Sequence, residues 1–227
     1  PAVRELGVLE PHHDVTFFVG ENGAGPSTVL EAIAVALGLP AEGGTKNVSR
    51  TQQEVSPLHR LLRVTKGWRW PRNSYFLRAE SLFNVFTYLD ELGPDPLDRP
   101  SLHLRSHGEA FMDVMLGFRG DGLYLLDEPE AALSPNRQLA ALTVIDRLVK
   151  QGAQFIIATH SPILLAYPRA KILSFDGTGI AEISYEDTEH YAVTRDFLNH
   201  YPRRLEQLLD DEPGSEPDFE KFPKTGL

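Results

Sequence analysis

The sequence predicts an α/β fold built on a mostly parallel sheet, and three observations support this class. Short apolar runs, which are typical of buried strands, alternate with longer segments whose apolar residues recur at helical spacing. A glycine-rich turn follows the first apolar run, and acidic or histidine residues follow two later runs. In open parallel sheets, ligands bind at the edge formed by the carboxyl ends of the strands.

The first part of the chain is expected to contain one strand and one helix. Residues 15–19 are apolar except for one threonine, as in a buried strand, and residues 26–37 repeat apolar side chains at helical spacing. Gly38 and Pro40 end this helix, because glycine suits the position just past a helix and proline cannot continue it. Residues 40–57 are rich in glycine and polar side chains, which predicts a loop.

The middle of the chain is expected to form an inserted helical lobe. Its expected elements are a short strand at 74–77, a helix at 80–92, a connection with three prolines at 93–100 and a helix at 108–118. We therefore expect one domain over residues 1–209, in which a lobe at about 46–118 interrupts a core made by 1–45 and 119–209.

The second half returns to alternating strands and helices. The expected elements are strands at 123–126 and 155–158, a helix at 135–150, a hairpin of 171–175 and 179–183, and a helix at 190–209. Pro135 suits a first helical turn, and Asp176 with Gly177 suits the hairpin turn. Residues 210–227 are rich in acid, proline and glycine, which predicts a disordered acidic tail.

Composition excludes several classes of function. The chain has no cysteine, so it has neither a disulfide framework nor a thiolate metal site. Its net charge of −10 argues against broad, non-specific binding of nucleic acid. No apolar run approaches the roughly 20 residues that span a bilayer, so no membrane insertion is expected, and the cytoplasm is the expected location.

Residues 20–28, GENGAGPST, are the most informative stretch of the sequence. They lie between a predicted strand and a predicted helix, which is the setting of a phosphate-binding loop. In such a loop, glycines let backbone N–H groups converge on phosphate oxygens, and the helix N-terminus adds a partial positive charge. The pattern G-x-x-x-x-G-K-[S/T] is complete except that Pro26 stands in place of the lysine.

Four further motifs follow this loop. They are SHGE at 106–109, LYLLDEP at 123–129, AALS at 131–134 and ATHSP at 158–162. In the second motif, four apolar residues end in Asp127 and Glu128, so two carboxylates lie at the ligand-binding edge of a strand. In the fourth motif, His160 also follows a buried strand.

The set GENGAGPST, SHGEAF, LYLLDEPEAAL and ATHSP resembles the ABC-type P-loop ATPases, and within them the small stand-alone RecF-like, AAA-family ATPases. The resemblance covers residues from about 15 to 176. It implies a P-loop NTPase fold that binds ATP and Mg²⁺ and hydrolyses the ATP. It also implies a head-to-tail homodimer with two ATP molecules in its interface, and leaves a further protein partner open.

The resemblance also implies roles for individual residues. The nucleotide would be bound by the loop residues Gly20, Asn22, Gly23, Ala24, Gly25, Ser27 and Thr28. The Ser27 hydroxyl and, through water, Asp127 would hold Mg²⁺. Glu128 would be the general base that polarises the attacking water, and His160 would contact the γ-phosphate.

Two features of the family are less sharply defined in this chain. Ser106, Gly108 and Glu109 match the signature that would cap the nucleotide of a second protomer, although an ordinary helix N-cap with a nearby acid explains them as well. The segment 131–134 would cross the same interface. Where the family has a glutamine after the strand that enters the lobe, this chain offers Arg78 or Glu80.

Pro26 brings neither the charge nor the backbone N–H that a lysine would bring to the phosphates. Charge-assisted hydrogen bonds are worth about 1.5–3 kcal/mol each, so losing two would weaken ATP binding by roughly 10²–10⁴-fold. Hydrolysis should be impaired as well, because phosphoryl transfer depends on such contacts. Lys46, Arg50 and Arg78 are the candidates for a compensating charge.

Two other functions stay open on the sequence. A non-hydrolysing nucleotide sensor or scaffold, a pseudo-ATPase, would keep the fold without turnover. A RecF-like DNA-maintenance module would use the basic window 59–72, with Trp68 and Trp70 stacking on nucleic-acid bases. A solvated basic face or a protein-binding surface also explains that window.

Overall fold

The computed structural model of the chain describes residues 7–45, 56–65, 67, 71–80 and 106–209. A six-stranded sheet with the order β2-β3-β4-β1-β5-β6 forms its centre. The strands are β1 (Val15–Gly20), β2 (Asn73–Arg78), β3 (Gly122–Asp127), β4 (Gln154–Ala158), β5 (Ala170–Phe175) and β6 (Ile180–Ile183). Neighbouring strands pair in parallel except β5 and β6, which form an antiparallel hairpin. The predicted α/β class with a mostly parallel sheet is confirmed.

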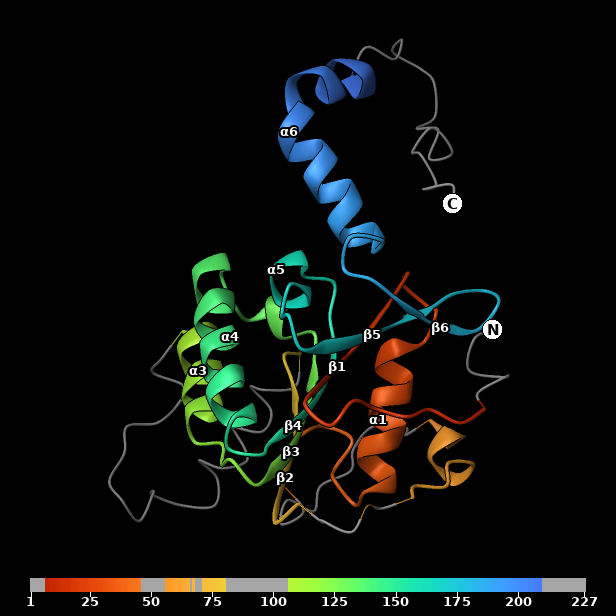
Figure 1. Cartoon of the computed structure of the whole chain (residues 1–227), viewed down its shortest axis with the longest axis vertical. Coiled ribbons are helices and arrows are strands. Elements are labelled where there is room, and N and C mark those ends of the chain that lie inside the picture. Colours follow the sequence, from red (N-terminus) through yellow and green to blue (C-terminus); the bar gives the residue numbers. More distant parts are fainter. Residues whose placement is uncertain (1–6, 46–55, 66, 68–70, 81–105, 210–227) are drawn as a thin grey trace.

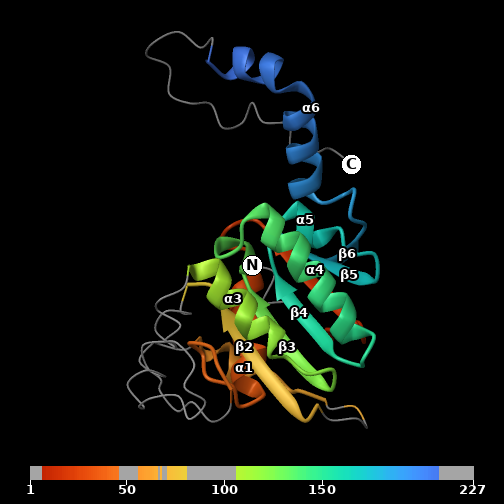
Figure 2. The same ribbon diagram turned by 90° about the vertical axis from the view of Figure 1, so that its left-hand side faces the viewer.

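Helices cover both faces of this sheet (Figure 1, Figure 2). They are α1 (Pro26–Ala36), α3 (His107–Leu116), α4 (Pro135–Val149), α5 (Pro162–Leu165) and α6 (Glu189–Leu209), with 3₁₀ turns η2 (Pro57–Arg60) and η4 (Pro129–Ala131). Helix α1 packs on one face, whereas α3, α4 and α5 pack on the other. The domain therefore has three layers, with the sheet between two layers of helices.

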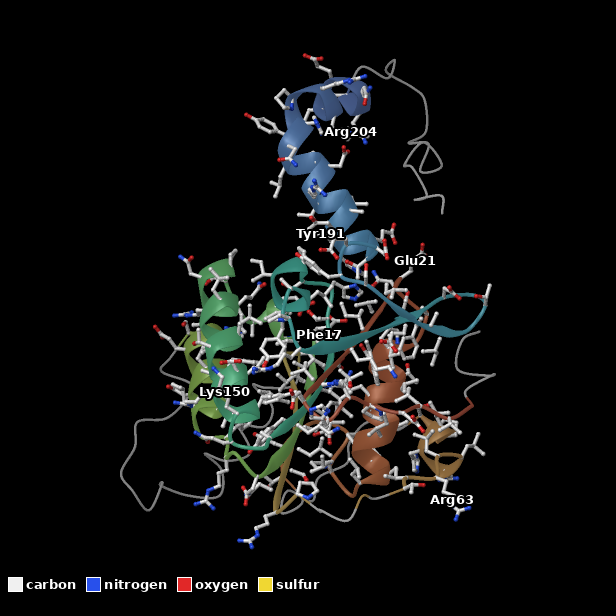
Figure 3. The ribbon with its side chains drawn as sticks, viewed as in Figure 1. Phe17, Glu21, Arg63, Lys150, Tyr191 and Arg204 are labelled. Carbon is white, nitrogen blue, oxygen red and sulfur yellow. The ribbon has the colours of Figure 1, made fainter. Side chains whose placement is uncertain are left out.

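Alternating side chains of the strands divide the core between these layers. Phe17 and Phe18 are neighbours in β1 and both are fully buried. They point to opposite faces, because successive side chains of a strand alternate. Phe17 belongs to the cluster under α3, α4 and α5, and Phe18 to the cluster under α1. Figure 3 shows Phe17 inside the body and Lys150 at its outer edge.

Two elements of the segment predicted as a helical lobe, β2 and α3, contribute to the main sheet and core. Strand β2 is the edge strand beside β3, and Phe111 of α3 is fully buried in the cluster that also holds Phe17. Three expected segments lie outside the described residues, wholly or in all but one residue: the helix at 80–92, the connection at 93–100 and the tail at 210–227. The division into core and lobe stays a prediction.

Three short elements, η2, η4 and α5, were not expected from the sequence. Each begins with a proline, Pro57, Pro129 or Pro162, whose fixed φ suits a first helical turn. Each spans only three or four residues, which is too few to repeat an apolar spacing. The other described helices and strands begin and end within two residues of their expected bounds.

Helix α6 projects from the body of the domain (Figure 1, Figure 2). None of its residues is buried, and its helical backbone breaks at His200, two residues before Pro202. Proline lacks the N–H needed by the helical ladder and crowds the preceding turn, which explains the break. Over the residues that the structure describes, no helix is long and apolar enough to cross a membrane.

The parallel register aligns the carboxyl ends of four strands. Phe18 of β1 pairs with Ala158 of β4, which pairs with Asp127 of β3. Asp127 in turn pairs with Arg78 of β2. The residues that follow these strands therefore lie along one edge of the sheet, where open α/β sheets bind ligands.

Replacing Phe111 with alanine tests whether α3 belongs to the main core. We expect the free energy of unfolding to fall by about 3–5 kcal/mol in a single transition, because the change leaves a cavity in the cluster beneath α3. Urea unfolding followed by circular dichroism and fluorescence measures this. Leu116→Ala is the matched control, since Leu116 is 52% exposed. A separate early transition, with the main one unchanged, would show that α3 belongs to an independent lobe.

Candidate functional site

The phosphate-loop sequence adopts a turn that depends on glycine. Gly23 and Gly25 have φ angles of 86° and 107°, in the left-handed region that glycine adopts readily. At Gly20, a Cβ atom would lie 2.6 Å from the carbonyl oxygen of Phe175, so β1 has no room for a side chain beside β5 at this point. Pro26 is in the first turn of α1, a position that proline accepts without breaking the helix.

Side chains from three strand ends surround one pocket beside this loop. The pocket has a volume of about 130 Å³. Its lining includes the loop residues Asn22, Gly23, Gly25, Pro26, Ser27 and Thr28, together with Glu128, Thr159 and His160. Of the expected loop residues, Gly20 and Ala24 line a neighbouring pocket instead. The turn predicted to bind phosphate, the acids Glu21 and Glu128 and a histidine thus face the same small volume.

Asp127 is the buried acid of the site. It is 4% exposed, and burial raises the pKa of its carboxyl to about 6, although a hydrogen bond from Ser27 and the charge of Arg78 lower that pKa. Its Oδ1 atom is buried and has no hydrogen-bond partner among the described residues. A carboxylate with one oxygen that has no partner in the described part of the chain, beside a hydroxyl, fits a hydrated Mg²⁺ ion, which takes oxygen ligands and keeps several waters.

Arg78 brings a positive charge to this acid from the end of β2. Its Nε atom lies 3.2 Å from Asp127 Oδ2, and its Nη1 atom lies 2.9 Å from Glu31 Oε2. The Arg78 side chain is 17% exposed, so solvent screens these two ion pairs less than surface pairs. Glu80, the other candidate for the missing glutamine, is exposed. Lys46 and Arg50 lie outside the described residues.

Glu128 has a backbone conformation that separates its side chain from that of Asp127. Its φ of 48° is the only positive value at a non-glycine residue in the described part of the chain. Such a conformation costs about 1–3 kcal/mol and is found mainly at functional sites. Its N–H donates to the carbonyl oxygen of Ala158 at 2.9 Å. Its side chain is 40% exposed and lines the pocket, whereas Asp127 stays buried.

His160 lies close to Glu128 in the pocket, with its Nε2 atom 3.9 Å from Glu128 Oε1. The backbone N–H of His160 donates to Glu130 of η4, whose other carboxylate oxygen accepts from Thr159 Oγ1 at 2.6 Å. Glu130 therefore ties the residues after β4 to those after β3. Glu130 lies within the motif LYLLDEPEAAL, but it was not predicted to belong to the site, because its partner Thr159 is 29 residues away in the sequence.

A second histidine lies beside His160. The His160 Nδ1 and His190 Nε2 atoms are 2.8 Å apart, and the ring centroids are 5.0 Å apart. His190 is the second residue of α6. His190 was not predicted as a site residue, because the spacing between a loop and the start of a distant helix carries no local sequence pattern.

The three signature residues lie away from the pocket, at the start of α3. Ser106 and Glu109 form a capping box, in which each backbone N–H donates to the other side chain. Arg137 of α4 donates to both of these side chains. At Gly108, a Cβ atom would lie 2.8 Å from the Ala132 carbonyl oxygen, so α3 lies tightly against the segment 131–134. Within one chain, Ser106 and Glu109 thus act as an ordinary helix N-cap with a nearby acid, which is the alternative explanation of these residues.

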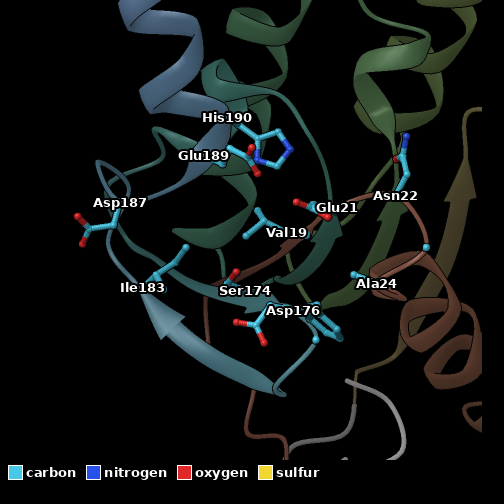
Figure 4. A pocket seen from close by; sticks show the side chains of 14 residues that line it. Val19, Glu21, Asn22, Ala24, Ser174, Asp176, Ile183, Asp187, Glu189 and His190 are labelled. Carbon is cyan, nitrogen blue, oxygen red and sulfur yellow. The ribbon is translucent and has the colours of Figure 1, made fainter. Parts of the chain in front are cut away.

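A larger pocket of about 560 Å³ adjoins the loop next to β5 and β6 (Figure 4). His190 lines it, together with four acidic residues, Glu21, Asp176, Asp187 and Glu189. Carboxylates accept hydrogen bonds from hydroxyl and amino groups, but they repel a phosphate. The smaller pocket has two acidic residues, Glu21 and Glu128, against four in the larger one, so phosphate groups are expected in the smaller pocket, on the side of Ser27.

Comparisons with known proteins agree with these features. Residues 106–166 match a family model described as "AAA domain, putative AbiEii toxin, Type IV TA system". The ribose import ATP-binding protein RbsA of Bacillus cereus is 22% identical over 92% of this chain and 48% of its own length, so the chain spans about half of that relative. The cytochrome c biogenesis ATP-binding export protein CcmA of Bartonella quintana is 29% identical over 68% of this chain and 78% of its own length.

Among solved structures, the SMC head domain from Thermotoga maritima is similar at 17% identity and a TM-score of 0.41, over 78% of this chain and 92% of that one. The family model covers the signature, acid-pair and histidine motifs, and both relatives are ATP-binding proteins by name. With a glycine-rich loop after β1 and these motifs in order at the carboxyl edge of the sheet, the matches support a P-loop ATPase of the ABC type.

Proposed function

We propose that this chain binds ATP and Mg²⁺ at the pocket between the phosphate loop, Glu128 and His160, and that two copies hydrolyse ATP as a head-to-tail dimer. The observation that carries the proposal is the meeting of three strand ends at this one pocket. Nucleotide as the ligand class is supported by relatives named as ATP-binding proteins. Pro26 lowers both the affinity and the turnover.

The phosphate loop holds the triphosphate mainly through its backbone. Helix α1 begins at this loop, so its N-terminal partial positive charge is directed at the pocket. Pro26 removes one N–H from the set that would point at the phosphates. Ser27 and Thr28, in the same first turn, keep their hydroxyls for the cation and for the α-phosphate. The turn therefore retains most of its donors and loses its strongest one.

Ser27 and Asp127 are the residues that would hold Mg²⁺, Ser27 through its hydroxyl and Asp127 through water. When bound, this ion would neutralise charge on the phosphates as the leaving group departs. Arg78 keeps the buried carboxylate of Asp127 ionised, because its charge lowers the carboxyl pKa that burial raises. Glu31, on the far side of Arg78, fixes the guanidinium in place.

Glu128 and His160 are the residues that act on the attacking water and on the γ-phosphate. The half-exposed carboxylate of Glu128 accepts a proton from the water, as a general base. His160 donates a hydrogen bond to a γ-phosphate oxygen and steadies that geometry. Their side chains are 3.9 Å apart, so one phosphate group with its water is within reach of both.

Arg78 supplies the positive charge that Pro26 does not. Among the described residues, its hydrogen bonds and ion pairs involve only Nε and Nη1, which leaves Nη2 for a phosphate oxygen. Its partner Asp127 is hydrogen-bonded to Ser27 of the phosphate loop, so the guanidinium lies next to the expected cation. Arginine binds phosphate well, because its planar fork matches two oxygens.

The dimer places Ser106, Gly108 and Glu109 of one protomer over the nucleotide of the other. Ser106 and Glu109 lie at the exposed surface, where Arg137 bonds both side chains. A second candidate function, favoured by Pro26, is a nucleotide sensor that dimerises on ATP without hydrolysing it. Both functions use the same pocket and differ only in turnover.

Pro26→Lys is expected to raise ATP affinity by roughly 10²–10⁴-fold, because it restores a charge and an N–H at the phosphates. Turnover should rise with it. Isothermal titration and steady-state phosphate release measure the two effects, and Pro26→Lys combined with Glu128→Gln is the control that binds but does not turn over. Binding without turnover in both the unaltered chain and Pro26→Lys would favour the sensor. Absence of binding in both would contradict the nucleotide site.

Arg78→Gln tests the substitute charge. In the unaltered chain we expect ATP affinity to fall by about 10–100-fold, the value of one charge-assisted hydrogen bond. In the Pro26→Lys background the loss should be smaller, because lysine then provides the charge, and a double-mutant cycle measures this coupling. Arg169→Gln is the matched control, since Arg169 pairs with Asp146 and Asp14. An equal loss of ATP affinity in both backgrounds would show that Arg78 does not replace the missing lysine charge.

The pKa of Asp127, which is about 6, predicts how Mg²⁺-dependent ATP binding varies with pH. Asp127 must be ionised to hold the cation. The gain in affinity from Mg²⁺ should therefore be constant above about pH 7 and fall about tenfold per unit below about pH 6. Titrations with and without Mg²⁺ measure this gain. Asp127→Asn controls for protonation of ATP itself, and an identical pH profile in that variant would contradict the assignment.

A further inference from the structure

His160 and His190 form a hydrogen bond whose direction matters for the phosphate pocket. Their Nδ1 and Nε2 atoms are 2.8 Å apart, and a neutral imidazole has one N–H donor and one acceptor nitrogen. If His190 donates, His160 accepts on Nδ1 and must carry its own hydrogen on Nε2. If His160 donates, its Nε2 is a bare lone pair, and His190 carries its hydrogen on Nδ1.

The second arrangement is unfavourable at both of its ends. It would make His190 Nδ1 a buried N–H donor, and this atom has no partner among the described residues. Orphaned buried donors are rarer in proteins than under-satisfied acceptors. The second arrangement would also turn the lone pair of His160 Nε2 toward the Glu128 carboxylate, 3.9 Å away, where two acceptors repel each other. The first arrangement puts a hydrogen there instead.

We propose that His190 is a positioning residue, which donates from Nε2 to His160 Nδ1 and thereby holds His160 as the Nε2–H donor facing the phosphate pocket. This proposal rests on the proposed function for the identity of the ligand, a phosphate oxygen of ATP. The tautomer itself is a property of the chain without nucleotide. In metal sites the same device is common, where a second hydrogen bond fixes which nitrogen of a histidine is protonated.

The surroundings of His190 hold it against His160. Thr188 is fully buried; its hydroxyl donates to the Tyr185 carbonyl oxygen at 2.7 Å and accepts from Tyr191 N–H at 3.3 Å. Tyr185 in turn donates from its hydroxyl to the carbonyl oxygen of Pro162, two residues after His160. The first turn of α6 is therefore bonded to the segment that carries His160.

The charge state of His190 suits a neutral donor. Burial, and then the neighbouring His160, lower the pKa of the His190 imidazole below its ordinary value of 6.5. Several ionisable groups face it from the elements around the larger pocket, namely Glu21, Asp176, Asp187 and Glu189. His190 remains uncharged near neutral pH, so it keeps one hydrogen, which the geometry assigns to Nε2.

Long-range ¹H–¹⁵N correlation spectra of ¹⁵N-histidine-labelled chain test the proposal without nucleotide, at about pH 8.5, where ordinary imidazoles are neutral. The chain has eight histidines, and His160→Gln and His190→Gln assign the two signals. We expect both imidazoles as Nε2–H tautomers, with His160 Nδ1 shifted as a hydrogen-bond acceptor. His160 observed as the Nδ1–H tautomer, or as a free mixture of tautomers, would overturn the proposal.

Three variants separate positioning from packing. His190→Phe keeps a ring but has no donor, so His160 should become a mixture of tautomers. His190→Gln offers an amide N–H where Nε2 stood and should restore the single tautomer. His200→Phe is the matched control on the same helix. His200 is 61% exposed and, within the described part of the chain, bonds only Asp196 of α6, so the His160 signals should be unchanged. An unchanged His160 in His190→Phe would overturn the proposal.

The same variants distinguish a failure of the His160 tautomer from a failure of ATP binding. If ATP binds and the His160 tautomer is fixed, His190→Phe should reduce the preference for ATP over ADP by about tenfold, the loss of one oriented hydrogen bond to the γ-phosphate. If no variant and not even the unaltered chain binds ATP, the proposed function fails, while the nucleotide-free spectra still decide the tautomer. An unchanged preference for ATP beside a lost tautomer would overturn the role of His190 at the phosphate.

Discussion

The parallel register of β1, β3 and β4 is the constraint on which the site depends. Ala158 pairs with Phe18 on one side and with Asp127 on the other, so the three strands reach the same edge of the sheet together. The glycine-rich loop, the acid pair and the histidine, which lie at the ends of these strands, are therefore close together in space. A shift of one residue in any of these strands would turn its side chains to the opposite face and separate the three groups.

Pro26 leaves the fold of this loop intact but removes part of its chemistry. Proline is acceptable in the first turn of α1, and the left-handed glycines that shape the turn, Gly23 and Gly25, are present. The backbone therefore keeps its cradle while the lysine charge and one N–H are missing. Arg78 brings a cation to the same acid from β2. A positive charge can reach such a site from a neighbouring strand, because the ends of adjacent strands are close enough for one long side chain to span them.

Local sequence signals predicted most of the fold and the chemical groups of the site. The apolar runs indicated β1, β3 and β4, and the residues after them carried Ser27, Asp127 and His160. Other contacts depend on the tertiary arrangement, which sequence spacing does not contain. Glu130 bonds residues after β4, and His190 reaches His160 from a helix that begins 29 residues later. The short helices that start at prolines were missed because periodicity needs more than one turn.

Amide hydrogen exchange of the unaltered chain, with and without millimolar Mg²⁺ and ATP, tests the central claim most directly. The account predicts slower exchange in the phosphate loop, residues 20–28, and in the segment 158–161, since their N–H groups would face the phosphates or lie beneath them. Protection confined to the acidic pocket next to β5 and β6, or no protection in the loop at all, would contradict a phosphate site at the carboxyl edge of this sheet.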